Sequence, residues 1–102
     1  MRIAIIDLRA EAGNESAVAD FLQAHAARSR ILEDGCIDFQ IAVDPEDSAG
    51  LSIIMTYATA ESQAAHRETA HFQRFVTECV PMLEDAPDGT KFFGRRLLDR
   101  IG

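Results

Sequence analysis

The side chains best suited to acid–base chemistry are three histidines and a single tyrosine, and three of these four residues lie between positions 57 and 71. His66 is the strongest candidate for a general base, because the unperturbed pKa of imidazole lies close to neutral pH. The alternative is that His66 is a polar side chain that closes a helix end. We therefore predict His66 as the catalytic base, with a structural role as the competing interpretation.

Tyr57 and Asp7 are the next candidates for catalytic residues. Tyr57 ends an apolar segment and could donate its hydroxyl to a substrate oxygen, although an aromatic residue at a strand end is more often only part of a wall. Asp7 interrupts an apolar segment, where a lone carboxylate needs a partner, a pocket or solvent. Strand alternation places Asp7 on the same face as Ile3 and Ile5, and the sequence does not indicate which face meets the helices.

Four further residues are predicted to line a substrate site: His71, His25, Phe39 and Phe72. His71 lies beside a predicted helix start, where the helix dipole favours the neutral ring, and it also suits a capping or surface role. His25 falls on the apolar stripe of a helix, where a core histidine with one hydrogen bond is the simpler interpretation. The two phenylalanines are expected to be apolar wall.

The sequence predicts neither a metal nor a cofactor. His66 and His71 are five residues apart, which does not place two ligands on one helix face, and no third ligand follows at a useful spacing. Glycine-rich phosphate or dinucleotide motifs are absent from the sequence. Cys36 and Cys79 match neither a paired-cysteine zinc site nor a redox CxxC motif, so we predict two reduced core cysteines.

Hydrophobic periodicity predicts which elements position these residues. Apolar or alternating segments predict four strands, over residues 3–8, 37–43, 51–58 and 92–98. Apolar residues spaced three and four apart predict a helix over residues 15–31, capped by Asn14. Thr59 and Thr69 are predicted to cap two later helical segments, the first of which carries His66. Turn-forming residues over 44–50 predict a hairpin loop.

The order strand, helix, strand, strand, helix, strand is that of a split βαβ fold. We predict an α+β, ferredoxin-like single domain over residues 1–102, with a four-stranded antiparallel sheet that carries the helices on one face. The opposite face of such a sheet needs cover. We therefore expect a homodimer in which two sheets pair as a dimeric α+β barrel.

Charge and hydropathy exclude several partners. The 17 acidic and 10 basic residues give a formal net charge of -7, which opposes binding to nucleic acid or to anionic membranes. The first apolar run is far shorter than the core of a signal peptide, and no long apolar segment follows. A cytoplasmic location is expected.

Several short motifs together resemble the antibiotic biosynthesis monooxygenase (ABM) domain family of dimeric α+β barrels. They are Gly35-Cys36-Ile37-Asp38-Phe39, the Asp44-Pro45-Glu46-Asp47 hairpin, Tyr57 at a strand end, Ala65-His66, and His71-Phe72 followed by Phe75. The resemblance implies a pocket between the helices and the sheet. It also argues against haem, because the position comparable to the axial histidine of haem-degrading relatives is Val76. The chain departs from the family at Met55-Thr56-Tyr57, where many relatives have acidic residues and a tryptophan.

The resemblance implies a cofactor-independent monooxygenase-type enzyme that acts on a small aromatic, quinol-like or polyketide-like substrate with molecular oxygen. His66 would be the base, and Tyr57 and Asp7 would position the substrate. One alternative is an isomerase of small carbonyl compounds that uses the same histidine without oxygen. Another is a non-catalytic, ligand-binding or protective dimer whose pocket residues are structural.

Overall fold

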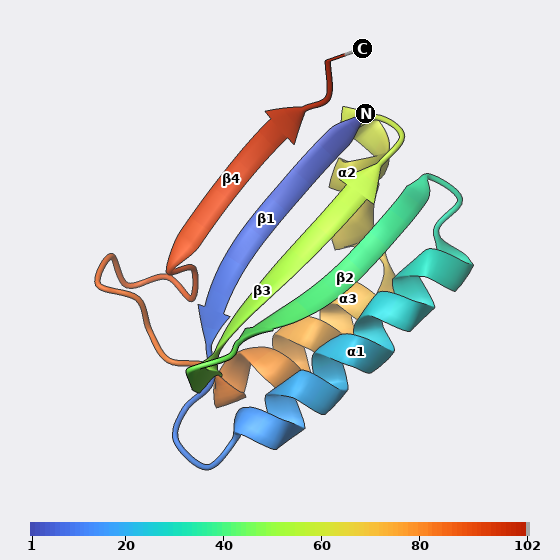
Figure 1. Cartoon of the computed structure of the whole chain (residues 1–102). Coiled ribbons are helices and arrows are strands. Elements are labelled where there is room, and N and C mark those ends of the chain that lie inside the picture. The colour runs from blue at the N-terminus through green and yellow to red at the C-terminus, as the bar shows by residue number, and fades with distance from the viewer. Residues whose placement is uncertain (102) are drawn as a thin grey trace.

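One antiparallel sheet forms the centre of the molecule in a computed structural model that describes residues 1–101 (Figure 1). Its four strands lie in the order β2-β3-β1-β4, so the two central strands are β3 and β1. The strands are β1 (Arg2–Arg9), β2 (Cys36–Asp44), β3 (Asp47–Tyr57) and β4 (Gly94–Asp99).

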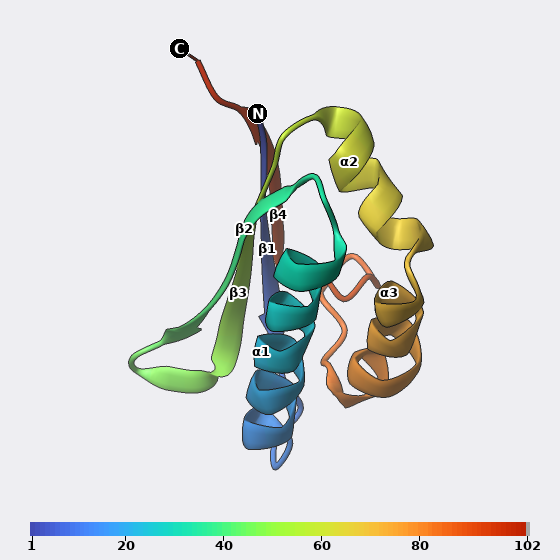
Figure 2. The same cartoon turned by 90° about the vertical axis from the view of Figure 1, so that its right-hand side faces the viewer.

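All helical segments cover the same face of this sheet (Figure 2). The long helix α1 connects β1 to β2, and a chain of short segments connects β3 to β4. The segments are α1 (Glu15–Leu32), α2 (Ala60–Ala65), the 3₁₀ turn η1 (His66–Glu68), α3 (Ala70–Arg74), the π-helical turn η2 (Phe75–Cys79) and the 3₁₀ turn η3 (Val80–Met82). The predicted α+β, ferredoxin-like βαββαβ architecture is confirmed.

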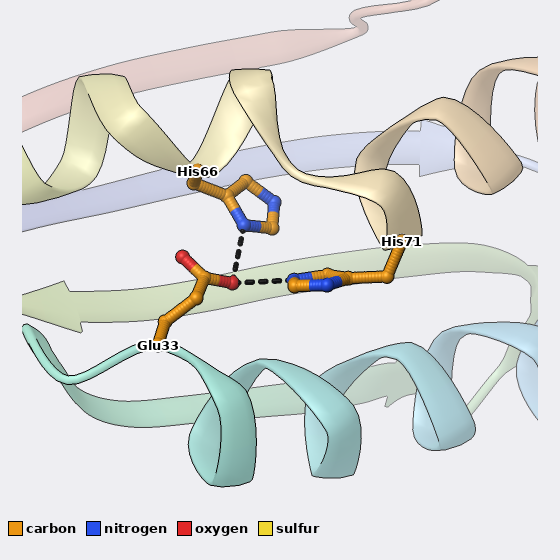
Figure 3. Close-up of side chains that lie close together, drawn as sticks. All are labelled: Glu33, His66 and His71. Carbon is orange, nitrogen blue, oxygen red and sulfur yellow. Dashed lines mark hydrogen bonds and ion pairs between the residues drawn. The ribbon is translucent and has the colours of Figure 1, made fainter.

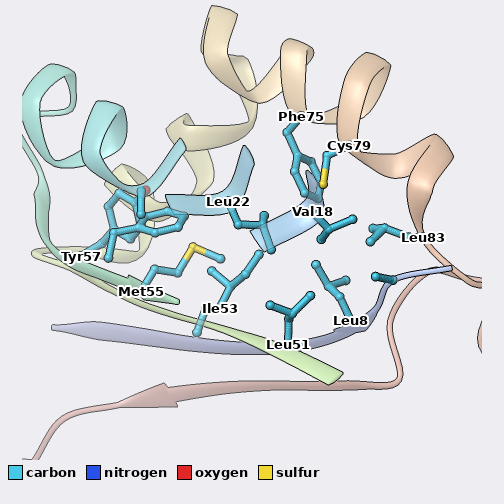
Figure 4. Packing of buried hydrophobic residues seen from close by; sticks show 14 residues of the cluster. Leu8, Val18, Leu22, Leu51, Ile53, Met55, Tyr57, Phe75, Cys79 and Leu83 are labelled. Carbon is cyan, nitrogen blue, oxygen red and sulfur yellow. The ribbon is translucent and has the colours of Figure 1, made fainter. Parts of the chain in front are cut away.

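The hydrophobic core lies between the sheet and the helices (Figure 4). Alternate residues of β3 point into it, because side chains of a strand alternate between its two faces. Its fully buried members include Leu8 from β1, Leu22 from α1 and Leu83 after η3. Cys79 is also buried there and Cys36 is half-buried, and both are free thiols.

Threonine caps begin the two helical segments that carry the candidate histidines. The Thr59 side chain accepts a hydrogen bond from the Ser62 backbone N–H, and the Ser62 hydroxyl oxygen accepts one from the Thr59 N–H, which completes a capping box. Thr69 caps α3 by accepting from the Phe72 N–H. Both predicted caps are confirmed. The predicted Asn14 cap is wrong in one respect, since its side chain makes no capping hydrogen bond.

Two predicted boundaries differ from the structure. The hairpin loop expected over residues 44–50 is much shorter, because Asp44 pairs with Asp47 and β3 begins at Asp47. The turn-forming residues Ser48 and Gly50 are therefore part of a paired strand. The last strand begins at Gly94 instead of residue 92. Neither change moves the candidate histidines.

On β1, Ala4 and Leu8 are buried against the helices. Since side chains alternate between the two faces of a strand, the opposite face of the sheet carries Ile3, Ile5 and Asp7. Cross-strand neighbours extend this face through Ile54 and Leu98. Ile3, Ile5 and Ile54 are half-buried and Leu98 is exposed. Within residues 1–101, no helix has the length and apolar character needed to cross a membrane.

Candidate functional site

A buried carboxylate, Glu33, lies at the centre of the candidate site (Figure 3). One of its oxygens, Oε2, lies 2.8 Å from Nδ1 of His66 and 2.5 Å from Nε2 of His71. The other, Oε1, accepts a hydrogen bond of 3.0 Å from the Tyr57 hydroxyl. The side chains of Glu33, His66 and His71 are between 5% and 10% exposed. The carboxylate is thus held by three donors in a nearly dry environment.

A break in the helical chain brings His66 and His71 together. His66 begins the 3₁₀ turn η1, whereas His71 is in the first turn of α3. Thr69 between them has an extended backbone, with φ of -79° and ψ of 154°. Its hydroxyl donates to the His66 carbonyl at 2.7 Å and accepts from the Phe72 N–H at 3.1 Å, so one side chain joins both segments. The change of axis lets two histidines five residues apart contact the same oxygen.

Glu33 comes from the opposite side of the site, immediately after α1. An acidic residue at this end of a helix is disfavoured by the helix dipole. Glu33 leaves the helical conformation, with φ of -105° and ψ of 111°, and its N–H bonds to the Ser29 carbonyl. The unfavourable position is therefore offset by the three donors that its carboxylate meets.

His25 of α1 completes the cluster. Its Nε2 lies 3.4 Å from Nε2 of His66, at the long limit of a hydrogen bond. Its Nδ1 is buried and has no hydrogen-bond partner within residues 1–101. The three imidazole rings lie 5.2 to 5.5 Å apart between centroids, so every histidine of the chain is in this one cluster.

Burial and the carboxylate determine the charge states of this cluster. Burial lowers the pKa of His66, although the Glu33 carboxylate opposes this effect. Burial also lowers the pKa of His25 to about 4, with His66 and His71 adding to the shift. Hydrogen bonds from His66 and His71 lower the pKa of Glu33 against the opposing effect of burial. Glu33 is therefore ionised and both shifted histidines are neutral at pH 7.

An ionised Glu33 fixes the tautomer of His66. A carboxylate only accepts hydrogen bonds, so Nδ1 of His66 must carry the proton. Nε2 of His66 then has a free lone pair, and it is this nitrogen that faces His25. Burial, and next the Glu33 carboxylate, raise the pKa of Tyr57, so its phenol stays protonated and donates to Glu33.

A cavity of about 260 Å³ adjoins the cluster, between the helices and the sheet. His25 and His66 are part of its wall. Most of the remaining wall is apolar, and these apolar residues come from all four strands, from α3 and η2, and from the loop before β4. These apolar residues are Ala4, Ile6, Phe39, Ile53, Met55, Phe72, Phe75, Phe92 and Leu97. The polar wall consists of Gln63, Arg67 and Arg95 besides the two histidines.

The structure brings most of the predicted site residues together. His66, His25, Phe39 and Phe72 all line the cavity. Asp7 does not: it is on the opposite face of the sheet, where its carboxylate accepts a hydrogen bond of 2.6 Å from the Ser52 hydroxyl. The prediction that Asp7 positions the substrate with His66 does not fit this geometry. The sequence left the sheet face of Asp7 open, and the structure places it on the face away from the helices.

Tyr57 and His71 lie behind the cavity wall. Tyr57 is fully buried and its hydroxyl bonds to Glu33, so it holds the carboxylate instead of pointing at a substrate. His71 is 5% exposed and also bonds to Glu33. His71 is therefore not among the residues that line the cavity, where it was predicted to lie. The alternative of a surface or capping role does not hold either, because Thr69 provides the cap and the imidazole is buried.

Sequence reasoning missed Glu33, Arg67 and Arg95. The one signal for Glu33 was an acidic residue at the end of a helix, where the dipole makes it unfavourable without a partner. Arg95 is exposed, but it lines the cavity, and its guanidinium lies 5.9 Å from the ring centre of Phe92.

The fold and the cavity define a ferredoxin-like α+β domain with room for a small ligand between helices and sheet. More specifically, the chain belongs to the ABM family, described as antibiotic biosynthesis monooxygenase, whose model matches residues 1–78. The predicted family membership is confirmed. No curated protein matches the chain.

Solved structures that bear the name of this family share the fold. One from Chloroflexus aurantiacus has a TM-score of 0.81 at 20% identity and covers 99% of this chain and 93% of its own. One from Nitrosomonas europaea has a TM-score of 0.80 at 20% identity, and the match covers 100% of this chain and 98% of that one. One from Deinococcus radiodurans has a TM-score of 0.83 at 16% identity, and the match covers 100% of this chain and 94% of that one. At these identities the likeness establishes the fold alone.

Proposed function

We propose that this protein is a cofactor-independent monooxygenase-type enzyme that oxidises a small aromatic, quinol-like or polyketide-like substrate with molecular oxygen. The observation that carries the proposal is the pairing of His66 Nδ1 with the buried Glu33 carboxylate at 2.8 Å, next to a mostly apolar cavity. Membership of the ABM family supports the reaction class.

His66 has the features of an oriented general base. Glu33 keeps the proton on Nδ1 and would stabilise the imidazolium that forms when Nε2 takes up a proton. The contact from Nε2 to His25 is long at 3.4 Å, so the lone pair is only weakly engaged. Tyr57 and His71 are positioning residues in this proposal, because both act through Glu33.

The cavity suits an aromatic substrate that becomes an anion. Phenylalanine side chains form much of its wall and exclude water, which strengthens electrostatic interactions inside it. Arg67 and Arg95 supply positive charge at the same wall, and no carboxylate is among the lining residues within residues 1–101. A phenolate or enolate formed by His66 would therefore meet cations within an otherwise acidic protein.

The reaction needs no external reductant when the substrate supplies the electrons. His66 removes a proton from a phenol or from an activated CH₂ group, and the resulting anion transfers electrons to oxygen. A carbon–oxygen bond then forms, the O–O bond breaks, and the second oxygen atom leaves as water with both substrate hydrogens. The substrate thus gains one oxygen atom and loses two hydrogens.

Oxygen consumption tests this proposal. Purified protein is mixed with a panel of hydroquinones and anthrone-type phenols in an oxygen electrode, and product mass is measured after reaction in ¹⁸O₂. We expect incorporation of one labelled atom, and a loss of about 100-fold or more in kcat for His66→Ala, as general bases contribute about 10²–10⁴-fold. Glu78→Gln, which alters a half-exposed ion pair, is the control. Turnover at the wild-type level in His66→Ala would contradict the role of His66.

The same panel separates oxygenation from proton-transfer chemistry. An isomerase of small carbonyl compounds would use the same His66–Glu33 pair but would work equally well without oxygen. Turnover that persists under argon with no change in product mass would replace the monooxygenase proposal by the isomerase.

We also propose that the protein is a homodimer whose sheets face each other. The sheet face opposite the helices carries the half-buried Ile3, Ile5 and Ile54 and the exposed Leu98, and a pairing of two such faces would cover them. Light scattering at micromolar concentration should give about twice the chain mass of 11.2 kDa. A mass of one chain would refute the dimer.

A further inference from the structure

We propose that Glu33, His66 and His71 form a binding site for a divalent first-row transition cation such as Zn²⁺. The three side chains are contributed by three separate segments and converge in the core (Figure 3). Each offers one ligand atom, and these atoms all lie within 4.8 Å of one another. The spacing of two histidines on one helix gave no indication of this site, because the ligands come together only across the break at Thr69.

The ligand set favours a transition metal over Mg²⁺ or Ca²⁺. Two imidazole nitrogens and one carboxylate oxygen match the preference of Zn²⁺ and related ions, whereas hard cations prefer oxygen ligands throughout. Three protein ligands would leave at least one coordination position for water or a small molecule. The anionic carboxylate would also reduce the cost of placing a divalent charge in the core.

The geometry requires a modest adjustment. Ligands bound tetrahedrally to one Zn²⁺ at about 2.0–2.1 Å lie about 3.3–3.4 Å apart. The separations between Glu33 Oε2 and the two nitrogens are 2.8 and 2.5 Å, so the carboxylate would retreat by about 0.5–0.9 Å, and all three ligand atoms already lie within 4.8 Å of one another. Glu33 follows the end of α1, outside its regular helical backbone, where a side-chain shift does not disturb a helix interior.

A second layer of contacts already orients the ligands. The Tyr57 hydroxyl donates to the Glu33 oxygen that does not contact the histidines, at 3.0 Å. Such partners of a ligating carboxylate fix its direction and raise metal affinity. The 2.7 Å hydrogen bond from Thr69 to the His66 carbonyl fixes the backbone between the two histidines.

Cation binding and the proposed base function exclude each other. A cation on Nδ1 of His66 takes the place of the proton there, so the proton of neutral His66 moves to Nε2. The ring then has no lone pair to receive a substrate proton. This consequence depends on the proposed function, whereas the binding itself does not.

Calorimetric titration of the chelator-treated protein with ZnCl₂, without substrate, tests the site. We expect one ion per chain, with a Kd of about 10 µM or tighter at pH 7.5, and no binding of Mg²⁺ or Ca²⁺ in the same range. His71→Gln should weaken Zn²⁺ binding by about 10-fold or more. Cys36→Ser, which replaces a half-buried thiol close to Glu33 and Tyr57, is the matched control and should bind as the wild type does.

A spectroscopic measurement on the wild-type protein keeps the test independent of how the variants fold. ¹⁵N NMR of the histidine rings distinguishes Nδ1 from Nε2, and one equivalent of Zn²⁺ should shift Nδ1 of His66 and Nε2 of His71. The ring nitrogens of His25 should not show a coordination shift. Binding weaker than about 100 µM, or stoichiometric binding that leaves the His66 and His71 nitrogens unshifted, would overturn the proposal.

Discussion

Glu33→Gln isolates the carboxylate that joins Tyr57, His66 and His71. The substitution keeps the shape of the side chain but replaces one acceptor oxygen by an NH₂ group that cannot accept a hydrogen bond. Three donors meet the carboxylate in the wild type, at 3.0, 2.8 and 2.5 Å. At least one of these donors will therefore lose its partner in the variant.

The expected cost follows from these contacts. A buried donor without a partner costs about 1–3 kcal/mol, and the remaining hydrogen bonds lose the strengthening that the charge gives them. Removal of a buried charge returns part of this cost. We expect a net loss of about 2–3 kcal/mol in the free energy of unfolding, which corresponds to a decrease of about 10–20 °C in Tm for a chain of this size.

Urea denaturation followed by far-ultraviolet circular dichroism at pH 7.5 measures this loss. Tyr57→Phe removes one of the three donors and should cost about 1 kcal/mol. Glu78→Gln makes the same chemical change in a surface pair whose side chains are 50% exposed, and should cost less than about 0.5 kcal/mol. If Glu33→Gln costs no more than Glu78→Gln, the carboxylate does not hold the cluster together and the assigned tautomer of His66 loses its basis.

Three further predictions concern the surroundings of the site. The pKa of His25 is about 4 in the folded protein against about 6.5 in the unfolded chain, so the free energy of unfolding should fall by about 3 kcal/mol as the pH falls from 6.5 to 4. Urea denaturation at several pH values should show a weaker pH dependence of this free energy in His25→Gln. An unchanged pH dependence would contradict the burial of His25 as a neutral ring. Asp7→Asn should change kcat by less than about twofold, because Asp7 bonds to Ser52 on the opposite sheet face, and a larger loss would return Asp7 to the site. Gly35→Ala should lower the free energy of unfolding, measured by urea denaturation, by about 1–3 kcal/mol. The new methyl group would lie 2.7 Å from the Ser62 hydroxyl oxygen and would clash with the residue that caps α2. Wild-type stability would show that the cap can shift freely.

The fold could be predicted because its signals are local. Three-and-four spacing over residues 15–31 predicts α1, and alternation over residues 37–43 predicts β2, and the structure forms both elements. In β2 only Phe39 and Ile41 pack on the core, whereas Ile37 and Val43 are exposed. The errors arose where local composition and pairing compete. Asp47, Ser48 and Gly50 are common turn residues, but pairing of β3 with its neighbours includes them in the sheet.

The site was harder to predict because its contacts connect distant segments. Glu33 lies 33 positions before His66 and 38 before His71, and no motif joins them. The five-residue spacing of the histidines excluded a shared site only under the assumption of one continuous helix. Thr69 was predicted as a cap, and the consequence of that cap, a change of helix axis between the histidines, was the missing step.

The composition of the cluster itself argues for chemistry over packing. Replacement of buried ionic or polar groups by apolar residues of similar size is often neutral or stabilising, so stability alone does not require three histidines and a carboxylate in one core. One of these histidines, His25, has a buried ring nitrogen with no partner within residues 1–101, which is a direct cost. Both roles proposed here use an ionisable group, which an apolar core lacks. Glu33 holds a proton on Nδ1 of His66. In the first role Nε2 takes up a substrate proton, and in the second a cation replaces the proton on Nδ1. Activity that falls as Zn²⁺ occupancy rises would link the two roles through the one imidazole ring of His66.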